Sequence, residues 1–95
     1  MPEMRFHIRW PDGRAEACYS PSLVIKDYLV PGQSYDLADF LARSRTALQI
    51  GSDRVAAKYG MPCSRALNQL ARIEAAARPF ADSPQPRVTV DAFDE

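Results

Sequence analysis

The feature that most constrains the fold is a strict alternation near the start of the chain, where apolar and polar residues take turns from Met4 to Trp10. A period of two places successive side chains on opposite faces of a strand, so this segment is expected to be a strand with one buried and one solvated face. Pro11-Asp12-Gly13 predicts a turn, because Pro presets φ and Gly accepts a positive φ. A second alternating run, residues 14–19, completes a predicted β-hairpin.

Two registers are open to this hairpin, and a slip by one residue moves every side chain of a strand to the other face. In the first register, Glu16 shares the apolar face. In the second, Tyr19 lies on the apolar face and His7 lies opposite Cys18 on the polar face. Burial of apolar side chains favours the second register, with a four-residue loop at residues 11–14.

Three helices are expected after the hairpin. Ser20-Pro21 indicates a short helix over residues 21–29 with Ser20 as its N-cap. Apolar residues spaced by three and four predict a long helix that follows a Ser34 cap and runs to Lys58. A third helix is expected over residues 62–77, with its apolar stripe facing inward: Cys63, Ala66, Leu67, Leu70, Ile73 and Ala77.

Two glycines carry local predictions. Gly51 lies on the apolar stripe of the long helix, where Gly costs ~1 kcal/mol relative to Ala. It therefore indicates either the close approach of another backbone or a break in the helix. Gly60 predicts a left-handed residue that ends this helix.

The C-terminal part of the chain completes the predicted architecture. Residues 1–80 are expected to form a single compact domain, and residues 81–95 a Pro-rich acidic segment. Residues 87–90 predict a third strand at the edge of the hairpin, since two strands alone are marginal in water; a loose tail is the alternative. The fold class is therefore α+β, with an N-terminal hairpin, widened by residues 87–90, packed on two long helices plus one short helix.

Length and composition restrict the class of protein. The 95 residues fit one domain, and 46% hydrophobic with 25% charged residues argues against disorder of the whole chain. No signal peptide and no apolar run near the ~20 residues of a membrane span is seen. A cytoplasmic location with reduced thiols and no membrane partner is therefore expected.

Charge is balanced overall but unevenly distributed. Residues 40–78 hold seven basic and two acidic residues (+5), while residues 79–95 hold one basic and four acidic (−3). Such asymmetry marks either an anionic partner or a helical face that the tail or a second subunit neutralises. A homodimer is also expected, because the long stripe offers more apolar surface than a hairpin covers.

The polar face of the hairpin is one candidate site. A thiolate beside a histidine and arginines would have a lowered pKa and could act as a nucleophile, or share a metal with the histidine. Metal sites usually need three or four ligands, so an ordinary polar face is favoured, with no metal or cofactor. Cys63 is expected to be buried and inert. The candidate face comprises Arg5, His7, Arg9, Glu16 and Cys18.

The third helix offers an alternative site with near helix-turn-helix spacing. Arg, Asn and Gln are side chains that read base edges. Against this, Gln69 sits where such motifs have an apolar residue, and the overall charge is zero. A solvated helix face explains the same residues, which are Ser64, Arg65, Asn68, Gln69 and Arg72.

Several segments together resemble a known family. They are residues 4–13, Tyr19-Ser20-Pro21-Ser22, Ala47-Leu48, Ser52-Asp53-Arg54-Val55, Tyr59-Gly60 and Cys63-Ser64-Arg65-Ala66. Over residues 4–78 the chain resembles small bacterial nitrogen-starvation-response proteins that are encoded in gene clusters with a nitrilase. This resemblance implies a context of nitrogen limitation and nitrile use, and it supplies no catalytic residues.

The favoured hypothesis is a non-enzymatic accessory or regulatory protein of nitrogen-starvation metabolism. It would act through protein–protein contacts, with an enzyme of the same gene cluster or as a homodimer. The two alternatives are a helix-turn-helix-like DNA-binding regulator and a small thiol- or metal-dependent enzyme. An enzymatic activity is left open but not favoured, because no recognisable catalytic set is found in the sequence.

Overall fold

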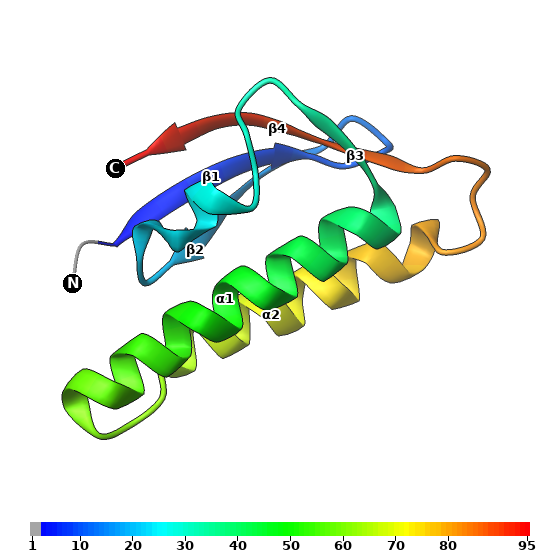
Figure 1. The fold of residues 1–95 in the computed structure, drawn as a ribbon. Helices are drawn as coiled ribbons and strands as arrows, with labels where there is room; N and C mark the ends of the chain where they lie inside the picture. Colours follow the sequence, from blue (N-terminus) through cyan, green and yellow to red (C-terminus); the bar gives the residue numbers. More distant parts are fainter. Residues whose placement is uncertain (1–2) are drawn as a thin grey trace.

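A four-stranded antiparallel sheet, covered on one face by a helical hairpin, forms the protein in the computed structural model, which describes residues 3–95 (Figure 1). The sheet has the order β2-β1-β4-β3. The predicted α+β class is therefore confirmed. In chain order the elements are β1 (Met4–Arg9), β2 (Ala15–Ser20), the 3₁₀ helix η1 (Leu23–Asp27), β3 (Ser34–Asp36), α1 (Leu37–Tyr59), α2 (Ser64–Ala77), the 3₁₀ helix η2 (Arg78–Phe80) and β4 (Arg87–Asp94).

The hairpin register differs from the prediction. Ile8 pairs with Glu16, and the Trp10 N–H donates to the Arg14 carbonyl at 2.8 Å, so the loop has three residues rather than four. Gly13 has φ of +90° and closes this loop, as expected for a three-residue hairpin. Glu16 is tolerated on the inner face because the Trp10 indole N–H donates to its carboxylate at 2.8 Å.

The strand at residues 87–90 is confirmed and extends to Asp94, but its predicted edge position is wrong. β4 lies between β1 and β3, so it has a partner on both sides. The outer partner β3 was not predicted, because three residues are too short to show an alternation. Ser34 belongs to this strand and does not cap α1, whose N-cap is Asp36.

The two long helices agree with the sequence in position. α1 is unbroken at Gly51, where a Cβ would lie 3.0 Å from the Pro21 ring carbon Cγ, so a proline side chain makes the close approach. Gly60 has φ of +84° and ends α1 as predicted. The short helix begins after Ser22 rather than Ser20, since the Ser22 hydroxyl accepts from the Val24 N–H.

The core lies between the sheet and the helical hairpin. Trp10 is central to it, with an edge-on contact to Phe40 at 6.0 Å and a stacked contact to Phe80 at 6.2 Å between ring centroids. Fully buried apolar side chains from both layers complete it: Phe6, Ile8, Phe40, Leu48, Ile73, Val88 and Val90.

The helical hairpin extends past one end of the sheet (Figure 1). Tyr59 and Met61, at the turn between α1 and α2, are 63% and 72% exposed. Within the part of the chain that the structure describes, no helix combines the length and apolar character that crossing a membrane requires.

Candidate functional site

The two faces of the hairpin separate the residues of the predicted polar face. Arg5, His7 and Arg9 lie on the outer face of β1, as expected from the alternation. Glu16 and Cys18 lie on the opposite, inner face of β2, because of the observed register. The prediction that His7 and Cys18 are neighbours is therefore wrong.

Cys18 lies in an environment that does not activate its thiol. The side chain is fully buried, and this burial, together with the nearby Glu16 charge, raises the pKa of the Cys18 thiol. A thiol with a raised pKa holds little thiolate at neutral pH and is a poor nucleophile. Cys63, expected to be buried, is only half-buried. Across residues 3–95, no three His, Cys, Asp or Glu side chains gather as a metal site would need.

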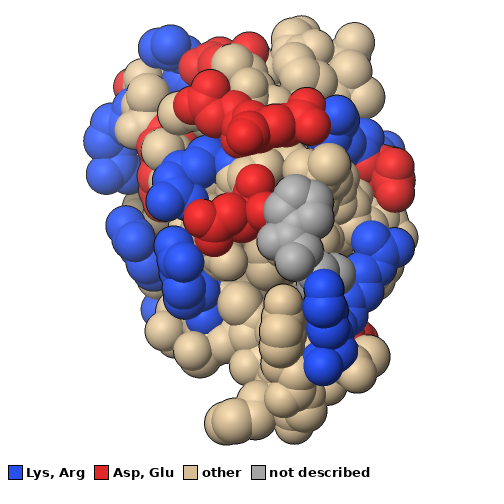
Figure 2. All heavy atoms as spheres, turned by 90° about the vertical axis from the view of Figure 1, so that its left-hand side faces the viewer, with Lys and Arg blue, Asp and Glu red and all other residues tan. Residues whose placement is uncertain are grey.

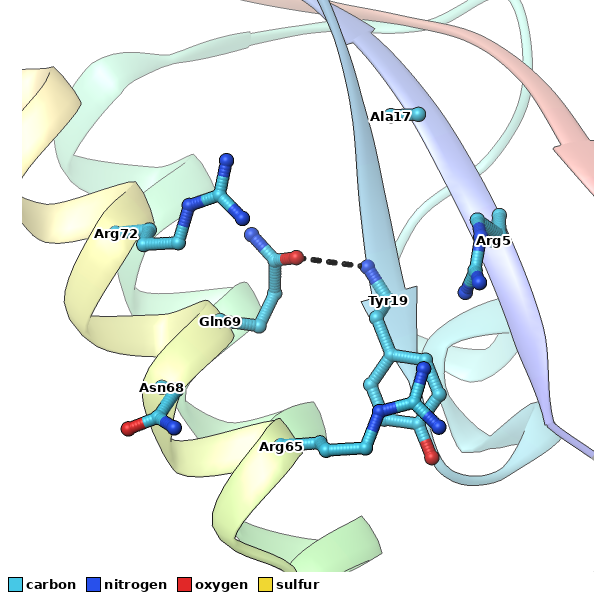
Figure 3. Close-up of a pocket in the computed structure, with 7 residues that line it drawn as sticks. All are labelled: Arg5, Ala17, Tyr19, Arg65, Asn68, Gln69 and Arg72. Atoms are coloured by element: carbon cyan, nitrogen blue, oxygen red, sulfur yellow. Dashed lines mark hydrogen bonds between the residues drawn. The ribbon is translucent and has the colours of Figure 1, made fainter.

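A groove forms where α2 packs beside the free edge of β2 (Figure 3). It has a volume of about 360 Å³. Its lining carries three guanidinium groups, one from β1 and two from α2. The lining residues are Arg5, Ala17, Tyr19, Arg65, Asn68, Gln69 and Arg72.

One hydrogen bond ties the two sides of the groove together. The Tyr19 backbone N–H points away from β1 and donates to the side-chain oxygen of Gln69 at 2.9 Å. Because the N–H requires an acceptor, the Gln69 amide oxygen must face β2 and its NH₂ group must face away. Gln69 is only 6% exposed, and its amide nitrogen has no hydrogen-bond partner among the described residues.

Tyr19 lies between two of the arginines. The Arg65 guanidinium carbon is 4.0 Å and that of Arg5 is 5.6 Å from the centroid of its ring. Burial of the phenol outweighs the opposing effect of Arg65 and raises the pKa of Tyr19 to about 12. The ring therefore stays neutral at physiological pH, and it serves as a platform that holds guanidinium groups at the groove.

The cations of the groove have few acidic partners. Neither Arg5 nor Arg72 forms an ion pair with any residue of the described chain, and Arg65 has only Glu3, at 3.5 Å. The acidic C-terminal residues pair elsewhere, with side chains of β1 and η1: Asp91 with Arg9, Asp94 with His7 and Glu95 with Lys26.

The space-filling view shows acidic and basic side chains beside one another at one end of the molecule (Figure 2). Asp and Glu side chains gather in the upper part of the end view, and Lys and Arg side chains flank them on both sides (Figure 2). The basic block predicted from the sequence is thus not neutralised by the acidic tail.

The residues proposed for base reading have a different setting from a DNA-binding helix. Arg65, Asn68, Gln69 and Arg72 line the groove together, whereas Ser64 is an exposed residue at the start of α2 outside the lining. α1 and α2 run side by side in opposite directions (Figure 1), not at the 90–120° typical of a helix-turn-helix. The helix-turn-helix premise is wrong for this helix pair, while nucleic-acid binding itself stays a prediction.

Sequence reasoning missed that the two candidate sites are parts of one groove. Of the residues that line the groove, Arg5 belonged to the candidate polar face of the hairpin and four belonged to the candidate face of the third helix. Ala17 and Tyr19 belonged to neither. A signal was present in α2: Gln69 follows Ala66 by three residues, within the stripe that continues to Leu70 and Ile73. Gln69 is buried and Leu67 is 39% exposed, the reverse of the expectation for Leu67.

The fold and the groove define a class of small α+β protein, in which an antiparallel sheet carries a helical hairpin on one face and an arginine-lined groove at one edge. Residues 5–93 match the model of a family described as nitrogen starvation-induced protein NitG, and the chain belongs to this family. The match extends beyond residue 78, where the sequence resemblance was expected to end, and includes most of β4. Comparisons with curated proteins and with solved structures gave no match.

Proposed function

We propose that this member of the nitrogen starvation-induced family is a non-enzymatic accessory or regulatory protein that binds an acidic segment of a partner protein in the arginine groove. One observation carries the proposal. Three guanidinium groups line a single groove, and two of them, those of Arg5 and Arg72, have no ion-pair partner among residues 3–95.

The composition of the groove favours a protein partner. Arginine and aromatic residues are enriched where protein interfaces gain most of their affinity. A groove of about 360 Å³ suits one or two side chains. A nucleic acid would instead present a continuous row of phosphates, which needs a longer basic surface than one groove with three guanidinium groups.

The proposed partner is an enzyme encoded beside this protein. The family description supports the context of nitrogen starvation. The nitrilase-containing gene cluster, by contrast, is part of the proposal and rests on the sequence resemblance. The predicted homodimer also stays a prediction, and the native mass of the purified protein tests it.

The experiment is co-expression with the neighbouring genes during nitrogen starvation, followed by affinity capture and native mass spectrometry. We expect one enzyme of the cluster in a fixed stoichiometry, released at high salt. The double variant Arg5→Glu/Arg72→Glu should abolish the complex. Its matched control, Arg54→Glu/Lys58→Glu, reverses two exposed α1 cations that lie outside the groove and have no ion pair in the described chain.

Two results would contradict the proposal. The first is a complex that survives Arg5→Glu/Arg72→Glu but is lost in Arg54→Glu/Lys58→Glu. The partner would then contact the C-terminal end of α1 rather than the groove. The second is a turnover of a nitrogen compound by the purified protein alone.

A further inference from the structure

We propose that one end of the groove is a carboxylate-binding subsite, formed by the side-chain amide of Gln69, the guanidinium of Arg72 and the backbone N–H of Ala17. The inference deepens the proposed function and rests on it for the source of the carboxylate. It names the chemical group that the groove receives.

The strongest argument is the unpaired donor of Gln69. Gln69 is only 6% exposed, its oxygen accepts from the Tyr19 N–H, and its nitrogen has no acceptor among the described residues. A buried donor left without a partner is destabilising, so such groups usually have a role. A flip of the amide would lose the Tyr19 bond, so the NH₂ group is held on the side that faces Arg72 (Figure 3).

Arg72 supplies the second donor. Its guanidinium and the Gln69 amide nitrogen point toward one another across one side of the groove (Figure 3). Both groups are donors, so neither can satisfy the other. An acceptor placed between them would satisfy both, and a carboxylate has two oxygens in the planar arrangement that a guanidinium fork recognises.

The edge of β2 adds a third donor. In an antiparallel ladder, alternate residues direct their N–H and C=O groups to the same side. Since the Tyr19 N–H points away from β1 to Gln69, the Ala17 N–H, two residues earlier, points to the same open edge. The small Ala17 side chain leaves this part of the groove open, opposite Arg72 (Figure 3).

The number of donors favours a carboxylate over a phosphate. One guanidinium, one neutral amide and one backbone N–H match the two oxygens and single charge of a carboxylate. A phosphate group carries at least three terminal oxygens and up to two charges, and it usually needs more cations or a helix N-terminus. The carboxylate can come from an Asp or Glu of a partner protein or from a free small acid.

The test is an NMR titration of the isolated protein at constant ionic strength, following the Gln69 side-chain NH₂ and the Ala17 backbone N–H. The probes are acetate, succinate, a short Asp/Glu-rich peptide and inorganic phosphate. We expect saturable shifts of both signals with the carboxylates. A peptide that binds more tightly than succinate identifies the source as a partner protein; the reverse order identifies a free acid.

Two variants remove single donors from the subsite. Arg72→Gln alters an exposed side chain and should weaken carboxylate binding about tenfold or more. Gln69→Glu keeps the acceptor for the Tyr19 N–H, replaces the donor with a negative charge and should abolish binding. Arg54→Gln, outside the groove, should leave binding unchanged.

Phosphate that binds more tightly than every carboxylate, or carboxylate shifts that bypass Gln69 and Ala17, would overturn the subsite. If the titration fails while Arg5→Glu/Arg72→Glu still abolishes partner capture, the subsite is wrong and the proposed function stands. If the titration succeeds while capture is insensitive to those arginines, the subsite stands and the proposed function is wrong.

Discussion

The two edges of the sheet use arginine in different ways. At the β3 edge, Arg87 is fully engaged: its guanidinium donates to the Asp36 carboxylate at 2.8 Å, the Ser34 carbonyl at 2.8 Å and the Ser34 hydroxyl at 3.0 Å. At the β2 edge, Arg5 and Arg72 have no such partners in the described chain. Arginine therefore joins two strands by hydrogen bonds at one edge, whereas at the other edge it has no ion-pair partner in the described chain.

The backbone of the two edge strands also has different partners. Beyond its three ladder pairs with β4, the β3 edge is extended by Gly32 and Gln33, which exchange hydrogen bonds with Val90 at 2.7 and 2.9 Å. At the β2 edge, one side-chain oxygen, from Gln69, covers a single N–H. Exposed strand edges are sites where other chains bind, and at the β2 edge the free backbone lies beside the unpaired guanidinium groups of the groove.

The largest expected effect on stability comes from the one contact that covers the β2 edge. Gln69→Leu keeps the side chain's bulk but leaves the Tyr19 N–H without an acceptor. We expect the free energy of unfolding to fall by about 1–2 kcal/mol, less than the full cost of one unsatisfied donor, because the substitution also removes the unpaired NH₂ group. Urea denaturation measures this change, and Gln69→Glu, which retains an acceptor, should lose less. An unchanged midpoint for Gln69→Leu would show that the contact does not stabilise the edge.

Arginine substitutions at the two edges should separate structure from binding. Arg87→Gln removes a charged donor from three acceptors and should lower the free energy of unfolding by about 1 kcal/mol, discounted for exposure. Arg5→Gln should change it by less than about 0.5 kcal/mol, as is usual for an unpaired surface residue. Partner capture should be weakened more by Arg5→Gln than by Arg87→Gln. If the two variants changed stability equally and capture equally, the two edges would not differ in role.

The β2 edge should also be the more sensitive to alkali. The folded pKa of Tyr19, about 12, lies above the unfolded value of ~10. Its contribution is therefore complete below pH ~10 and is lost as the pH rises toward 12, because the unfolded chain releases the proton first. Chemical denaturation at pH 9.5 and 11.5 measures how far the free energy of unfolding falls between these two pH values. This fall should be about 1 kcal/mol smaller in Tyr19→Phe than in the natural protein, and equal falls would contradict the prediction.

The smallest effect concerns the only acidic residue that contacts a groove arginine in the described chain. Glu3 lies 3.5 Å from the Arg65 guanidinium, and both side chains are more than half exposed. Glu3→Gln should therefore raise the affinity for the acidic peptide by only about two- to threefold, in proportion to a weak surface ion pair. Isothermal titration at low and high salt measures this change, which should vanish at high salt.

The fold was predictable wherever a pattern repeats. The alternation of β1 and the three-and-four spacing of α1 and α2 located these elements, because burial of one face imposes the period. The register of β2 was not predictable, since either set of its residues alternates equally well. The observed register allows the Trp10 indole to donate to Glu16, and this hydrogen bond exists only in the folded chain.

The groove was not predictable as a unit, although most of its residues were singled out. Its two sides are 50 residues apart in the sequence where Tyr19 meets Gln69. Helical periodicity alone does not specify which strand edge α2 lies beside. The predicted pairing of His7 with Cys18 failed for a related reason, since a register shift of one residue moved Cys18 into the core.

Amide hydrogen exchange of the complex, compared with the free protein, tests the difference between the two edges most directly. We expect new protection in residues 15–19 and 65–72, on both sides of the groove, and unchanged exchange in residues 34–36 and 87–89 at the β3 edge. Protection at the β3 edge, or at the turn between α1 and α2 without any at β2, would contradict the account.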